Sequence, residues 1–157
     1  MSERAAALLL AGALLSAACG PIPSGTLAGE PAPPPASWEE VVEETGFCEV
    51  ESRPSDPHSI QLYCFVHEGG LYVQSHRWAL APWWPTTSWA AIWLEHPDVT
   101  VRIESSLYQL RAVQVTESEG RSVVMASIGY DPPPEGIVLF RFEPRPWTGG
   151  LRFPCPR

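Results

Sequence analysis

The sequence predicts a mainly β fold with a few short helices. Several segments alternate apolar and polar residues with the period of two that is typical of half-buried strands. One of them, 107–116, changes the phase of its alternation midway, which indicates a bulge or a sharply coiled strand, as at the corner of a barrel. Short capped segments between the strands predict the helices. The six predicted strands are 47–53, 60–67, 71–75, 99–104, 107–116 and 137–142.

The first two strands should pair as an antiparallel hairpin, because only a short turn with two prolines separates them. If the hairpin folds around Asp56, Cys48 and Cys64 fall roughly opposite each other on the core-facing side. A disulfide there would contribute about 3 kcal/mol in the chain-entropy model. Directly paired strands accept such a bond only in some registers, so Cys48–Cys155 is a rival pairing. Two buried free thiols are the other alternative.

The first helix is predicted from a capping box at 37–40. The Ser37 side chain should accept a hydrogen bond from the amide of Glu40, whose carboxylate should reach back. The helix should then cover 38–45 and end at Gly46.

Two further helices follow from similar signals. Segment 89–95 should begin at Thr87 or Ser88 and end before the next proline. A second capping box at 116–119 favours a helix over 120–128, although this stretch also reads as a strand.

The amino terminus resembles a bacterial lipoprotein signal peptide. Residues 5–15 form an apolar run that is too short for a spanning helix, and small residues lead from it into Cys19. This pattern implies cleavage before Cys19 and acylation of its thiol. A plain secretory peptide cut near Ala17 or Ala18 is the alternative. Gly20 follows the cysteine where inner-membrane lipoproteins carry aspartate, so the resemblance implies the outer membrane, facing the periplasm.

Four regions follow from these signals. They are a signal peptide at 1–18, a proline-rich tether at 19–36, a barrel domain at 37–143 and a proline-rich tail at 144–157. The tether should be unfolded and semi-rigid, lifting the domain off the lipid surface. The tail should pack over the surface of the domain.

Composition excludes several kinds of chemistry. The net charge is −8, which argues against nucleic-acid binding. The chain has no lysine, so Schiff-base catalysis and a P-loop are excluded. No cysteine or histidine spacing predicts a metal site. In an oxidising periplasm, Cys48, Cys64 and Cys155 should form one disulfide and leave one thiol.

The order of these elements resembles the split β-barrel of flavin- and deazaflavin-dependent reductases and pyridoxamine-phosphate-oxidase relatives. The segments FCEVESR at 47–53, GGLYVQS at 69–75 and WLEHPDVTVRI at 93–103 carry the likeness, with LYQLRAVQVT at 107–116. The resemblance implies a six-stranded antiparallel split barrel with two or three short helices. By analogy with that family, it also implies a homodimer formed across the barrel.

The same resemblance implies a cofactor site for FMN or a deazaflavin. In that family, the cofactor phosphates contact basic and hydroxyl side chains near the third strand and the loop after it. In this chain, a tryptophan-lined cleft could stack a planar ring. The matching positions are Ser75, His76 and Arg77, with Arg53 possible from the first strand, and Trp83 and Trp84 are the candidates for stacking the ring. Relatives usually place a lysine or arginine in the loop before the second helix, whereas this chain has Pro-Trp-Trp-Pro at 82–85.

Two functions from different classes follow. In the first, the barrel is a catalytically silent or weakly ligand-binding module, and its tryptophans fill the end of the barrel. In the second, it is a flavin- or deazaflavin-dependent oxidoreductase whose cofactor supplies the reactivity. No nucleophile–base–orienter set is visible, so hydrolysis is not expected. The missing loop cation favours the silent module.

Overall fold

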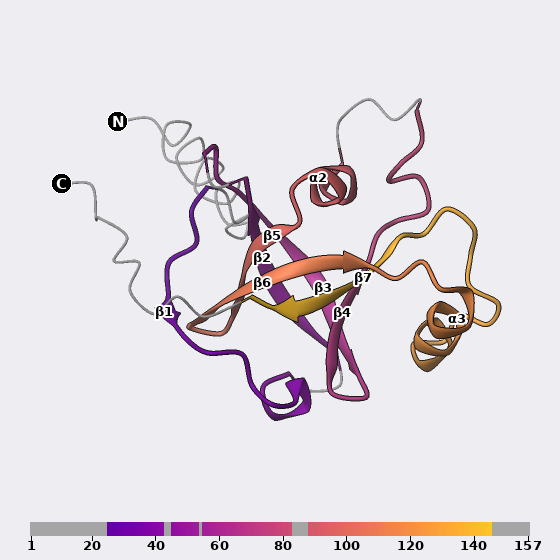
Figure 1. Cartoon of the computed structure of the whole chain (residues 1–157), viewed down its shortest axis with the longest axis horizontal. Helices are drawn as coiled ribbons and strands as arrows, with labels where there is room; N and C mark the ends of the chain where they lie inside the picture. The colour runs from indigo at the N-terminus through magenta and orange to yellow at the C-terminus, as the bar shows by residue number, and fades with distance from the viewer. Residues whose placement is uncertain (1–24, 43–44, 54, 83–87, 146–157) are drawn as a thin grey trace, which may run out of the picture.

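Six strands form a closed antiparallel barrel (Figure 1). The computed structural model describes residues 25–42, 45–53, 55–82 and 88–145. The strands are β2 (Thr45–Ser52), β3 (His58–His67), β4 (Gly70–Gln74), β5 (Asp98–Ile103), β6 (Ser106–Gln114) and β7 (Leu139–Pro144). Their order is β6-β5-β2-β3-β4-β7, and pairing of β7 with β6 closes the barrel. The predicted mainly β fold is confirmed.

Two α-helices and one short helical turn accompany the barrel. They are η1 (Trp38–Glu40), α2 (Trp89–Glu95) and α3 (Ser118–Ser127). A two-residue strand, β1 (Glu30–Pro31), adds to β6 in parallel. The predicted 89–95 helix is confirmed, with Ser88 as its N-cap. The helical alternative for 120–128 is also confirmed, although Glu117 caps it.

The predicted helix over 38–45 is wrong. It ends after one 3-10 turn, and the chain enters β2 at Thr45, which pairs with Phe65. Pairing with a neighbouring strand therefore overrides the local capping signal. Ser37 accepts its hydrogen bond from the amide of Glu39, 3.4 Å away.

The Glu39 carboxylate, rather than that of Glu40, completes this turn. It accepts hydrogen bonds from the Ser37 hydroxyl and from the Gly69 amide, the latter at 2.8 Å. These two bonds hold the pKa of Glu39 below its usual value, with the Ser37 hydroxyl contributing most. Glu39 thus ties η1 to the turn between β3 and β4.

The barrel has two ends that differ in what covers them. Because β2 and β4 both run antiparallel to β3, their carboxyl ends lie at the same end of the barrel. We call this the α2 end; it is defined by Ser52 and Gln74, and by Asp98 where β5 begins. The opposite end, defined by His67 and Ser106, is the η1 end. Figure 1 shows α2 at the top of the view and η1 at the bottom.

Apolar side chains fill the interior of the barrel. Trp38 packs from the η1 end, with its ring centroid 5.0 Å from that of Tyr108. Trp93 packs from α2, with centroids 5.4 Å from Phe140 and 5.7 Å from Phe142. Between them lie buried side chains from the other five strands: Cys48, Val50, Cys64, Leu71, Val73, Val99, Val101, Ile103, Leu110 and Ala112.

A second apolar cluster lies on the outer surface. Val124 and Met125 of α3 cover Phe65, Tyr72 and Leu139, which point outward from three neighbouring strands. This cluster explains the changed phase of the 107–116 segment.

Strand β6 therefore contains no bulge. It pairs with β5 through 106–111 and with β7 through 110–114, each time in unbroken register. Val115, just beyond its end, packs against the α3 cluster outside the barrel. Apolar residues thus occur on both faces of the strand, and of the two alternatives predicted from the pattern, a bulge or a sharp coil, the bulge is wrong.

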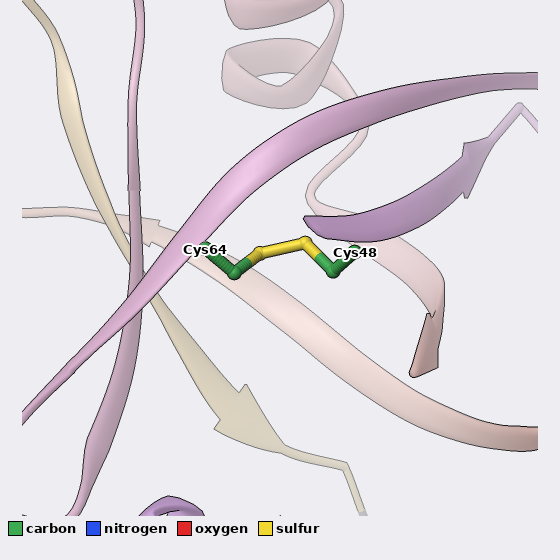
Figure 2. Close-up of a disulfide and its surroundings, with 2 residues drawn as sticks. All are labelled: Cys48 and Cys64. Atoms are coloured by element: carbon green, nitrogen blue, oxygen red, sulfur yellow. A yellow bond between two sulfur atoms is a disulfide. The ribbon is translucent and has the colours of Figure 1, made fainter. Parts of the chain in front are cut away.

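A disulfide joins Cys48 of β2 to Cys64 of β3 (Figure 2). The register places Cys48 opposite Leu62 and Cys64 opposite Gly46, so the two cysteines are diagonal neighbours and do not face each other directly. Their Cα atoms are 5.8 Å apart, within the range that a disulfide accepts. The predicted bond is confirmed, and the Cys48–Cys155 pairing and the free-thiol alternative are wrong.

Part of the predicted tether is docked on the barrel. Leu27 is buried, and its amide donates to the Glu51 carboxylate at 2.5 Å. Gly29 approaches so closely that a Cβ there would lie 2.6 Å from the carbonyl oxygen of Ser105. Strand β1 follows at once. Residues 27–32 thus pack on the folded unit, in contrast to the free tether expected from the prolines of 19–36.

Candidate functional site

The described candidate residues lie at the α2 end of the barrel. Arg53 follows β2, and Ser75, His76 and Arg77 follow β4. The remaining candidates fall outside the described residues. These are Trp83, Trp84, Cys19 and Cys155, together with the signal peptide and tail residues 146–157.

The Ser75 hydroxyl is used by the fold itself. The side chain is 3% exposed; its Oγ donates to the carbonyl of His76 at 3.0 Å and accepts from the amide of Val138 at 2.9 Å. The Ser75 amide also donates to the Val138 carbonyl at 2.8 Å. Gly136 lies against this junction at a φ of +77°, and a Cβ there would collide with the carbonyl oxygen of Arg77. Ser75 therefore fastens β4 to the segment that leads into β7.

His76 and Arg77 are exposed and interact with the residue that follows them. The Nδ1 atom of His76 accepts the amide of Trp78 at 3.2 Å. The Arg77 guanidinium lies 5.4 Å from the centroid of the Trp78 ring, a cation–π arrangement. These contacts shape the loop after β4.

Arg53 supports the turn of the first hairpin. It has a φ of 56° and forms an ion pair with Asp56 at 3.7 Å. Both side chains are exposed enough that the pair contributes little to stability. The guanidinium is therefore already directed toward a carboxylate of its own turn.

The described tryptophans of α2 belong to the core. Ser88 accepts from the Ala91 amide at 3.2 Å and donates to the Ala79 carbonyl at 2.5 Å, which links the helix to the loop after β4. Trp93 is 1% exposed, and the ring of Trp89 lies 4.5 Å from it. For these two residues, the prediction that tryptophans fill the end of the barrel is confirmed.

The described candidates do not fit a flavin phosphate. A phosphate site needs donors that converge on one point and are free to bond the ligand. The Ser75 hydroxyl already accepts a hydrogen bond from the Val138 amide, and the Arg53 guanidinium forms an ion pair with Asp56. Arg77 retains its charge, but its guanidinium stacks on Trp78.

A polar network that the sequence did not reveal ties β7 to β5. The Asp98 carboxylate accepts from Arg111 at 3.0 Å and from Arg145 at 2.9 Å, and Arg145 also bonds Gln109. Burial raises the pKa of Asp98, but the hydrogen bonds from the two arginines outweigh burial and hold the pKa below its usual value. Asp98 and Arg111 lie in or next to neighbouring predicted strands. Arg145 lies in the predicted tail, where nothing in the sequence indicated that it would contact Asp98.

The described part of the chain holds no group of three or more histidine, cysteine, aspartate or glutamate side chains suited to a metal ion. Among its helices, none combines the length and the hydropathy needed to cross a bilayer.

No family model matches the chain, and no curated protein matches its sequence. The function therefore rests on the geometry of the barrel and on the chemistry of its residues.

Proposed function

We propose that this protein is a lipid-anchored β-barrel of the bacterial envelope that acts as a binding module without catalysis of its own. The observation that carries the proposed location is the Cys48–Cys64 disulfide, which lies inside the barrel with both residues at most 1% exposed. Disulfides persist in oxidising compartments such as the periplasm and are rare in the cytosol.

The amino terminus supports the same location. An apolar run at 5–15 followed by small residues and Cys19 is typical of lipoprotein export signals. Acyl chains anchor a protein because each buried methylene contributes about 0.8 kcal/mol. The two signals are independent: the disulfide favours an oxidising compartment, and the lipoprotein-like terminus with Gly20 favours the outer membrane facing the periplasm.

The absence of catalysis is proposed from how the candidate side chains are used. The Ser75 hydroxyl is hydrogen-bonded within the fold, the Arg53 guanidinium forms an ion pair with Asp56, and the barrel interior is filled by buried side chains. The six-stranded antiparallel architecture agrees with the resemblance to flavin reductases, but Ser75 serves the packing of this barrel, and Arg53, His76 and Arg77 make contacts within their own loops. The outer surface is then the part available for binding.

Lipidation can be tested on the full chain expressed in a bacterial host. We expect mass spectrometry to find a mature protein that begins at Cys19 and carries acyl chains, and fractionation to recover it with the outer membrane. The matched control is Cys19→Ser, which should remain unprocessed and unacylated. A mature, unmodified amino terminus just after Ala17 or Ala18 would refute the anchor.

Cofactor binding can be tested on the soluble form lacking residues 1–19. We expect a colourless protein and no quenching of flavin fluorescence when FMN is titrated to micromolar concentration. A deazaflavin titration should be equally silent. A yellow protein, or quenching that saturates at stoichiometric protein, would instead establish the oxidoreductase.

A further inference from the structure

The chain enters the barrel at the α2 end, close to the proposed anchor. Leu27 donates its amide to Glu51, one residue before the end of β2. The first described residue, Gly25, lies two positions earlier, and only residues 20–24 separate it from Cys19. Fully extended, the chain between Cys19 and Gly25 spans at most about 22 Å, since a residue covers roughly 3.6 Å. Figure 1 shows the described chain descending from the upper part of the view to β1 and η1.

This geometry places the start of the described chain, and so the anchor's point of attachment, at the α2 end of the barrel. Had residues 27–32 been free, the tether could have lifted the whole domain away from the bilayer. Because they are docked, the α2 end stays close to the lipid at Cys19. Residues 27–31 run along the barrel from the α2 end toward the η1 end, so the η1 end lies farther along the chain from the anchor.

The α2 end also exposes large apolar side chains. Trp78 and Leu80, in the loop after β4, are 46% and 44% exposed, and Leu94 of α2 is 44% exposed. Tryptophan is enriched at membrane interfaces, where its ring is apolar and its N–H is polar. Arg77, next to Trp78, can extend its charge to lipid phosphates while its methylenes stay in the apolar layer.

Both ends of the barrel carry exposed acidic side chains. The exposed side chains near the η1 end include Glu39, Glu40, Glu68 and Glu104, which anionic lipids would repel. At the α2 end, Asp56 and Asp98 are paired with arginines, while Glu95 and Glu135 are exposed, so the apolar side chains and the position of the chain start carry the orientation.

We infer that the α2 end of the barrel lies against the bilayer that holds the anchor, with Trp78, Leu80 and Leu94 in the lipid interface. The inference rests on the lipid anchor of the proposed function. The acyl chains provide durable attachment, and they make docking of this surface an intramolecular event at high effective concentration. The docked surface sets the orientation, so the η1 end faces the periplasm.

Hydrogen exchange on the lipidated full-length protein tests this orientation. The protein is reconstituted in vesicles of phosphatidylethanolamine with a minor share of phosphatidylglycerol, and compared with the soluble form lacking residues 1–19. We expect amide exchange in 76–82 to slow by roughly tenfold or more on vesicles, while 37–41 at the η1 end is unchanged.

Surface variants identify the side chains responsible. The combined variant Trp78→Ser, Leu80→Ser and Leu94→Ser should still float with vesicles but lose the protection in 76–82. The matched control is Phe47→Ser with Tyr63→Ser, which removes two more exposed rings, 58% and 63% exposed, from the side of the barrel. It should keep the protection.

The outcomes separate the inference from the proposed function. A protein that carries no acyl chains and does not float with vesicles would refute the anchor. A protein that floats but shows unchanged exchange in 76–82, or protection in 37–41 instead, would overturn the orientation alone. Equal protection in the soluble form at high protein concentration would show that a second copy covers this end, and would also overturn it.

Discussion

Replacing Trp93 by alanine is expected to lower the free energy of unfolding by about 3–5 kcal/mol. Trp93 is 1% exposed and contacts the rings of Trp89, Phe140 and Phe142, which come from α2 and β7. Its removal leaves a cavity between the helix and the barrel, because the strands cannot collapse into the space. Urea unfolding of the soluble form lacking residues 1–19 measures the loss.

Two matched variants make this result specific. Leu94→Ala changes the adjacent residue on the exposed side of α2 and should stay within about 0.5 kcal/mol of the wild type. Trp93→Phe keeps an aromatic ring and removes an indole N–H that has no hydrogen-bond partner among the described residues, so it should cost less than alanine. If Trp93→Ala were as stable as Leu94→Ala, α2 would not close the barrel as described.

The strands could be predicted from the sequence because alternation reflects burial directly. Val99, Val101 and Ile103 were expected to face the core, and all three are buried. Helix α2 was predicted at both ends, since its N-cap and the proline after it are local signals. The early end of the helix after Ser37 was not predicted, because it is set by the pairing of Thr45 with Phe65, which are distant in sequence.

The candidate site was harder to predict for the same reason. A serine and two arginines at the right positions are compatible with a phosphate site, but residue type does not say which partner takes each side chain. The backbone amide of Val138, 63 residues away in the sequence, donates a hydrogen bond to the Ser75 hydroxyl. Docking of the chain start is equally non-local, since Arg102 bonds the carbonyl of Ala28 across 74 residues.

Replacing both Cys48 and Cys64 by alanine is expected to lower the free energy of unfolding by about 3 kcal/mol. The disulfide closes a loop with a sequence separation of 16 residues, and the chain-entropy model gives about that value for such a loop. The midpoint of thermal unfolding should fall by roughly 10 °C for a domain of this size. Thermal unfolding of the soluble form without reductant measures the change.

The corresponding serine variant should be less stable still. Both positions are at most 1% exposed, so two hydroxyls would be buried there, each costing about 1–3 kcal/mol where no partner is found.

Reductant should destabilise the wild type but leave the alanine variant unchanged. Thiol labelling of the denatured, unreduced soluble wild type should modify Cys155 alone. An alanine variant as stable as the oxidised wild type, or three labelled thiols, would show that the bond inside the barrel does not form, and the argument for an oxidising compartment would lose its support.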